Sequence, residues 1–220
     1  MIVLGLNAFH ADSAAALLVD GRLVAAAEEE RFRRIKHWAG FPSQAIDWCL
    51  AHAGVELAQV DRVAINTDPR AGRMARAAYA IRHLPSPAMV IDRLRARSKR
   101  MSVEQHFASA FKGRRFGAQV IPIEHHLAHL ASAYYPSGFE RAVALSVDGF
   151  GDFASAAWGI GVRGRLAVDG KVGFPHSLGV FYQALTQFLG FPHYGDEYKV
   201  MGLAPYGSPR YADQLRRVVQ

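Results

Sequence analysis

The sequence predicts an α/β protein, because strand and helix patterns alternate along the chain up to Asn66. Three apolar runs of strand length open the chain, at residues 2–7, 14–19 and 22–27. Asp20-Gly21, between the second and third runs, is a strong hairpin turn signal. A helix with one apolar face then starts at Pro42-Ser43 and ends at Gly54, and a fourth strand follows at 60–66. This succession of strand, helix and strand is typical of the α/β class.

The opening pattern returns in the second half of the chain. Strand patterns occur at 142–148, 155–162 and 166–168, and a helix pattern follows at 177–189. In both halves the first strand runs into a turn that carries an aspartate, Asp12 in one and Asp148 in the other. A strand, a polar loop and a hairpin open each half of the actin-like ATPase and sugar-kinase fold. We therefore predict this fold, with duplicated βββαβα-type halves at 1–140 and 141–220, the second of them incomplete.

The positive charge is concentrated in one segment. The chain has 26 Lys and Arg against 19 Asp and Glu, and residues 70–115 hold twelve of the basic residues against two acidic ones. The segment has a net charge of +10, and the remainder, with 14 basic and 17 acidic residues, has −3. We interpret the segment as a basic helical insertion with a solvated face. Such a cluster could also bind nucleic acid, anionic lipid or a phosphorylated substrate. Because no known nucleic-acid motif accompanies it, nucleic-acid binding is not expected.

Composition bounds the compartment. Half of the residues are hydrophobic and a fifth are charged, so the chain can bury a core. The single cysteine, Cys49, excludes an internal disulfide framework and fits a reducing cytoplasm. The N-terminus lacks the basic lead and the apolar length of a signal peptide. No apolar run approaches the roughly 18 residues of a membrane span. We expect a cytoplasmic protein without a membrane-spanning segment.

A candidate metal site lies where a strand at 119–123 leads into a helix. His125 and His129 are four residues apart, so on a helix they lie on the same face and could bind one metal ion. Asp148, at the end of a strand and beside glycines, could complete the site. The alternative is a coincidence of composition, because the chain has ten histidines.

Three further segments carry candidate site residues. The loop after the first strand holds His10, Asp12 and Ser13, and it would face a nucleotide in the predicted fold. The acidic and basic residues of 28–37 could be only a solvated, self-paired segment. The turn at 195–207 mixes charges with glycines and suggests a ligand-facing loop, although a well-packed connection would have the same pattern. A helix is expected at 211–220.

Five motifs then occur in order along the chain. They are GLNAFHADSAA, EEERFRRIKH, EHHLAHLASAYYPSGF, SVDGFGD and GDEYKVMGLAPYG. In this order they resemble the N-terminal part of the carbamoyltransferases that include the nodulation protein NodU and the cephamycin and tobramycin carbamoyltransferases. The resemblance covers nearly the whole chain apart from the basic segment. It implies an actin-like domain like that of the TsaD tRNA-modification proteins, which in the family is followed by a YrdC-like domain.

The resemblance implies O-carbamoyl transfer. The YrdC-like domain makes carbamoyl-adenylate from carbamoyl phosphate and ATP, and the actin-like domain passes the carbamoyl group to a hydroxyl of a sugar, an antibiotic or another biosynthetic acceptor. It further implies Fe²⁺, or another divalent metal, bound by the candidate ligands above. The expected catalytic residues are His10, Asp12 and Lys36. Those expected to meet the nucleotide or carbamoyl group are Gly149, Gly151, Asp152, Lys199 and Gly202.

Two alternatives and one departure accompany this prediction. A TsaD-like partner in tRNA threonylcarbamoyl modification would share the fold and the histidine helix, and the basic segment could then meet tRNA. A non-catalytic actin-like fragment is the other alternative. The departure is that the chain ends at Gln220, where the family continues with a further acidic ligand and the YrdC-like domain. We therefore expect that the missing C-terminal part of the protein is its partner in catalysis.

Overall fold

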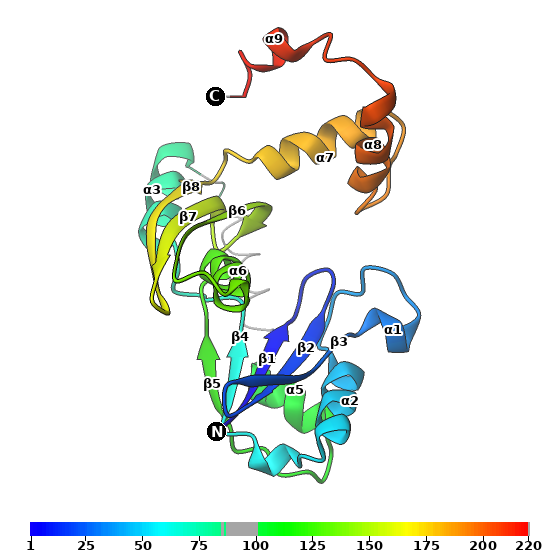
Figure 1. The fold of residues 1–220 in the computed structure, drawn as a ribbon, viewed down its shortest axis with the longest axis vertical. Helices are drawn as coiled ribbons and strands as arrows, with labels where there is room; N and C mark the ends of the chain where they lie inside the picture. Colours follow the sequence, from blue (N-terminus) through cyan, green and yellow to red (C-terminus); the bar gives the residue numbers. More distant parts are fainter. Residues whose placement is uncertain (85, 87–100, 220) are drawn as a thin grey trace. The chain divides into compact units, whose positions relative to one another are not determined.

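The computed structural model describes residues 1–84, 86 and 101–219 (Figure 1). Contacts divide the chain into two compact units, Met1–His125 and His126–Gln220. The sequence predicted the boundary later, after residue 140. The middle of the predicted basic insertion lies outside the described residues, and its described flanks are helical.

The first unit is built on a five-stranded mixed sheet in the order β3-β2-β1-β4-β5. Its strands are β1 (Ile2–Asn7), β2 (Ala14–Val19), β3 (Arg22–Glu28), β4 (Arg62–Ile65) and β5 (Gln119–Pro122). Strands β1, β2 and β3 form an antiparallel meander, whereas β1, β4 and β5 are parallel. Its helices are α1 (Glu30–Arg33), α2 (Ser43–Ala53), α3 (Arg73–His83) and α5 (Val103–Ala110), with a 3-10 turn at Leu57–Gln59. The predicted strands and the predicted helix at 43–53 are therefore present.

Alternating burial along the strands explains how this sheet packs. Leu4 and Leu6 of β1 and Val63 and Ile65 of β4 are buried at every second position, as the period of a strand requires. These side chains share one core with the apolar faces of α2 and α5. Phe107 of α5 is fully buried in that core. The carboxyl ends of the parallel strands are left to carry polar side chains.

The segment that follows β3 pairs its charges within itself, as its pattern suggested, but it is not wholly solvated. The Glu29 side chain is fully buried. It accepts hydrogen bonds from Arg33 Nε at 2.8 Å and from the backbone N–H of Ala45 at 2.8 Å. The Arg33 guanidinium lies over the Trp38 ring, 4.4 Å from its centroid. This correction arises because the partners of Glu29 include the first turn of α2, which no local charge pattern shows.

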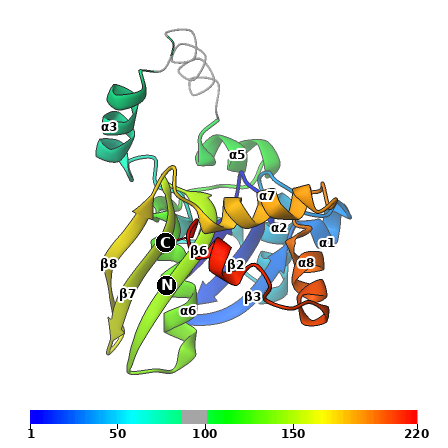
Figure 2. The ribbon, with the colours of Figure 1, turned by 90° about the horizontal axis from the view of Figure 1, so that it is seen from above.

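The second unit contains a three-stranded antiparallel sheet in the order β6-β7-β8 (Figure 2). Its strands are β6 (Arg141–Gly151), β7 (Ala154–Val162) and β8 (Arg165–Gly173). Its helices are α6 (His125–Tyr134), α7 (Leu178–Phe188), α8 (Glu197–Leu203) and α9 (Ala212–Leu215), with 3-10 turns at Tyr135–Ser137 and Ala204–Tyr206. Both units thus contain a three-stranded antiparallel meander. The duplication of whole βββαβα-type halves stays a prediction.

Helix α6 packs on the sheet of the second unit through small residues. Leu130 and Tyr134 share a small core with Ala144 of β6 and Ala157 of β7. A side chain at Gly161 would meet the Tyr134 ring at 2.3 Å, so the ring lies directly on the strand backbone. This close approach holds α6 against β7, the strand paired with the one that carries Asp148.

Three sequence predictions in this unit need correction. Asp148 lies inside β6 and not in a turn, because β6 extends to Gly151 and the hairpin turns at Asp152-Phe153, where φ is positive at both residues. The predicted loop at 195–207 contains α8, since an Asp196–Lys199 pair at i and i+3 supports a helical turn. Only Ala212–Leu215 of the helix expected at 211–220 is helical among the described residues.

In the part of the chain that the structure describes, no helix combines the length and the apolar character needed to cross a bilayer.

The buried Glu29 carboxylate yields a stability prediction. Glu29→Ala leaves Arg33 Nε and the Ala45 N–H without their acceptor, so we expect the free energy of unfolding to fall by about 2–4 kcal/mol. The matched control is Glu28→Ala, whose partner Arg31 is 3.5 Å away on the surface. The control should lose less than about 1 kcal/mol. Urea denaturation followed by circular dichroism measures both, and equal midpoints would contradict the burial of Glu29.

Candidate metal centre and strand-end site

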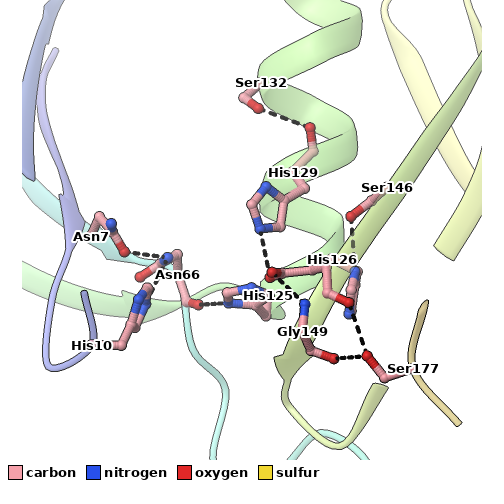
Figure 3. A network of polar contacts seen from close by, with 11 residues as sticks. Asn7, His10, Asn66, His125, His126, His129, Ser132, Ser146, Gly149 and Ser177 are labelled. Carbon is pink, nitrogen blue, oxygen red and sulfur yellow. Dashed lines mark hydrogen bonds and ion pairs between the residues drawn. The ribbon is translucent and has the colours of Figure 1, made fainter. Parts of the chain in front are cut away.

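The candidate metal ligands lie on α6 and on the adjoining strand β6. His129 Nε2 is 3.4 Å from Asp148 Oδ2, and both side chains are partly exposed. His125 begins α6 and lies one turn before His129 (Figure 3). The ligand atoms that His125, His129 and Asp148 offer lie within 4.8 Å of one another. Two imidazoles and one carboxylate at this spacing suit a first-row divalent metal. These three residues therefore fit the divalent metal ion that the sequence predicted.

The orientation of α6 is set by the histidine between the two candidate ligands. His126 is fully buried, and its Nδ1 is 2.9 Å from Ser146 Oγ of β6. Successive residues of a helix are about 100° apart, so His129 lies about 40° from His125, and His126 lies about 100° from His125 and about 60° from His129. Burying His126 against the sheet therefore places the face shared by His125 and His129 beside the packed face. The three histidines of α6 separate into one packing residue and two candidate ligands.

The Asp148 carboxylate is oriented by its own strand and by α7. The Gly149 N–H donates to Asp148 Oδ1 at 2.6 Å, which leaves Oδ2 on the side of His129. Ser177 Oγ is 2.7 Å from the Gly149 carbonyl oxygen and 3.2 Å from that of Asp148. Gly149 was expected to meet the nucleotide or carbamoyl group; in this arrangement its N–H donates to the Asp148 side chain.

His10 lies in a polar network at the carboxyl ends of β1 and β4 (Figure 3). Asn7 Nδ2 donates to the Asp12 carbonyl oxygen at 2.7 Å, which turns Asn7 Oδ1 toward Asn66. Asn66 Nδ2 then donates to Asn7 Oδ1 at 2.8 Å and lies 3.2 Å from His10 Nε2. Because a backbone carbonyl can only accept, this sequence of contacts makes His10 Nε2 an acceptor. A neutral His10 accordingly carries its proton on Nδ1.

Asn66 also contacts His125 within the first unit. The Asn66 carbonyl oxygen is 3.3 Å from His125 Nδ1. An Nδ1–H that donates to a backbone carbonyl leaves Nε2 of the same ring free of a proton and ready to act as a ligand. The His10 and His125 rings meet edge to face with their centroids 5.6 Å apart. One asparagine after β4 therefore contacts both histidines.

Asp12 and Lys36 lie in a second cluster of the first unit. Asp12 Oδ1 is 2.8 Å from His37 Nδ1, and the His37 N–H donates to Glu30 Oε2 at 2.9 Å. Asp12, Glu30 and His37 also offer ligand atoms within 4.8 Å of one another. Lys36 lines a neighbouring cavity of about 240 Å³ with three further charged residues, Glu30, Arg31 and Arg34. Glu30 belongs to both groups, so Asp12 and Lys36 lie near the same carboxylate.

The other predicted nucleotide-binding residues lie in the β6–β7 hairpin and in α8. Gly151 pairs with Ala154 at the end of the β6–β7 hairpin, and Asp152 lies in its turn. Lys199 Nζ is 2.6 Å from Asp196 Oδ1, and this hydrogen bond lowers the pKa of the Asp196 carboxyl below its usual range. Gly202 lies within α8. Lys199 is therefore paired with the residue that precedes its own helix.

The sequence analysis did not identify the residues that orient the histidines and Asp148. Asn7 ends β1 and Asn66 follows β4, and these two strands are parallel neighbours. An asparagine at the end of each apolar run was the pattern that could have indicated a shared polar site. Ser146 and Ser177 gave no signal, because their partners are distant in the sequence.

A family model and several known proteins are similar to this chain. The family model described as the carbamoyltransferase N-terminus matches residues 2–220. The uncharacterized protein sll1178 of Synechocystis is 39% identical over 97% of this chain, and the nodulation protein NolNO of Sinorhizobium fredii is 38% identical over 92% of it. These matches cover 36% and 29% of those proteins, so the chain spans about a third of the length of the curated relatives it matches.

Among solved structures, YeaZ from Pseudomonas aeruginosa is similar to this chain. The two are 21% identical, and the similarity covers 80% of this chain and 68% of that one at a TM-score of 0.41.

The Asp196–Lys199 pair yields a prediction about pH dependence. Its depressed carboxyl pKa stabilises the folded state above the unfolded-state pKa of about 3.9, and that contribution is lost as the pH falls through the folded-state pKa. Lys199→Met should raise the Asp196 pKa toward its usual value. Carboxyl ¹³C titration by NMR measures this, with Lys171→Met as a control that removes the same charge from β8. An unchanged Asp196 titration in Lys199→Met would contradict the pairing.

Proposed function

The chain belongs to the carbamoyltransferase family as its N-terminal region, and on this premise we propose that it transfers a carbamoyl group to a hydroxyl of a small biosynthetic acceptor. The observation that carries the proposal is the family match over residues 2–220. The two histidine sites described above supply residue types that suit this chemistry. We further propose carbamoyl-adenylate, made from carbamoyl phosphate and ATP, as the donor.

The transfer itself makes simple demands on the protein. The acceptor oxygen attacks the carbamoyl carbon, the bond from that carbon to the adenylate phosphate oxygen breaks, and the hydroxyl proton is released. The site must therefore orient the carbonyl, stabilise the negative charge that develops on oxygen, and hold the leaving phosphate.

A metal is proposed at the face that α6 and β6 share. Fe²⁺, or another divalent ion, would be held by His125, His129 and Asp148. When bound, it supplies Lewis-acid polarisation of an oxygen atom. Neither imidazole nor carboxylate ligands choose iron over zinc by themselves, so the identity of the ion rests on the family.

The hydrogen-bond network favours one role for His10. With Nε2 accepting from Asn66, its Nδ1–H is the atom that can donate to a bound ligand. We propose that His10 orients an oxygen of the carbamoyl donor or the acceptor through this proton. The Asn7–Asn66 pair would keep the ring in that orientation. Proton removal from the acceptor would then fall to another group.

The charged cavity beside Lys36 suits the anionic part of the donor. Arg31, Arg34 and Lys36 line it together with Glu30. Guanidinium and ammonium groups bind phosphate oxygens through charge-assisted hydrogen bonds. We propose that Lys36 contacts the phosphate or the carbamoyl group, and that Asp12 holds the adjoining loop through His37.

Carbamoyl transfer is tested with the full gene product. We expect radiolabel from carbamoyl phosphate to reach one of a panel of sugar or antibiotic hydroxyl acceptors in the presence of ATP. His10→Asn should lower the rate by about 10²–10³-fold, the usual cost of removing an orienting donor. His52→Asn, at an exposed position on α2, is the matched control. Label that reaches tRNA and no small acceptor would refute the proposed acceptor class.

Metal content is tested on protein purified without oxygen. We expect about one ion per chain in the parent and at least a tenfold weaker affinity in His129→Ala, because one of three ligands is lost. His52→Ala should bind metal like the parent. Equal metal content in all three proteins would place the ion elsewhere.

A further inference from the structure

The first turn of α7 packs against the backbone of the candidate ligand Asp148. A Cβ atom at Gly179 would lie 2.5 Å from the Asp148 carbonyl oxygen, 2.6 Å from its carbonyl carbon and 2.8 Å from the Gly149 nitrogen. All three atoms are backbone, so no flexible side chain could move aside. Only glycine fits at this position without displacing Asp148 and Gly149.

Ser177, just before α7, binds the same two residues. Its Oγ accepts from the Val180 N–H at 3.1 Å, which caps the helix. The single hydroxyl proton is directed to the Gly149 carbonyl oxygen at 2.7 Å, the shorter of its two carbonyl contacts. The residue before it is fixed as well, because buried Ser155 of β7 donates to the His176 carbonyl oxygen at 2.5 Å. The start of α7 is therefore attached to both β6 and β7.

Hydrogen bonds between β6 and β7 do not fix the backbone of Asp148. Regular pairing between β6 and β7 is interrupted between Val147 and Gly151, which leaves Asp148 and Gly149 outside the paired register. An irregular stretch of strand re-aims its side chains. Here the backbone of that stretch is held from the α7 side, while the Gly149 N–H turns the carboxylate through Oδ1.

We infer that Gly179 and Ser177 are positioning residues for the Asp148 carboxylate, and that the start of α7 sets Asp148 Oδ2 opposite His129 Nε2. This inference rests on the proposed function through the metal that these groups would hold. Neither residue touches the metal or a substrate. Their effect passes through the Asp148–Gly149 backbone.

A methyl group at 179 separates this role from simple helix packing. Alanine is a better helix former than glycine, so Gly179→Ala favours α7 itself and opposes only the contact with Asp148. Gly117→Ala is the matched control, because a Cβ there meets nothing within 4 Å and no positive φ is present. The second pair is Ser177→Ala, which removes the hydroxyl, and Ser177→Thr, which retains it.

The test measures Co²⁺ affinity by absorption titration and exchange of the Gly149 amide by NMR, with circular dichroism to check folding. We expect Gly179→Ala and Ser177→Ala to bind Co²⁺ at least tenfold more weakly and to exchange the Gly149 amide at least tenfold faster. Gly117→Ala and Ser177→Thr should behave like the parent. Parental affinity and exchange in both Gly179→Ala and Ser177→Ala would overturn the inference.

Two outcomes separate this inference from the proposed function. If the parent itself binds no Co²⁺, the proposed metal site fails, and the exchange of the Gly149 amide alone decides the positioning role. If Gly179→Ala does not fold, the Ser177→Ala and Ser177→Thr pair decides it, since a rescue by threonine requires the hydroxyl contact.

Discussion

The arrangement of the candidate metal centre depends on the burial of His126 against Ser146. This contact fixes the rotation of α6 on the sheet of the second unit, and the rotation decides which histidines face Asp148. A buried imidazole needs a hydrogen-bond partner, so the helix cannot turn without a cost of about 1–3 kcal/mol. The flat contact between Tyr134 and Gly161 adds a steric limit at the other end of the helix.

In the first unit, the side-chain amides of two asparagines orient His10. Ligands of open α/β sheets bind beyond the carboxyl ends of the parallel strands, where side chains from several strands come together. Asn7 after β1 and Asn66 after β4 meet there because these strands are paired in parallel. Their amides can only be oriented one way, since the chain of contacts starts at a backbone carbonyl. The result is a histidine whose tautomer is set by the fold.

The sequence predicted the features whose causes are local. Apolar runs of strand length and the Asp20-Gly21 turn signal revealed the strands of the first unit, and Ser43 to Gly54 showed both ends of α2. The spacing of His125 and His129 needed only the geometry of a helix. Glu29 was misjudged because its partner Ala45 lies in another element, and the glycines of 195–207 concealed α8. The contact of Gly179 with Asp148 has no trace in either local sequence, because it joins a helix to a strand.

The most direct test of the metal centre is anomalous diffraction at the iron edge, from crystals grown without oxygen. The account predicts one peak within bonding distance of His125, His129 and Asp148. A peak at the second cluster, Asp12, Glu30 and His37, would contradict it, as would crystals that contain iron bound to neither group.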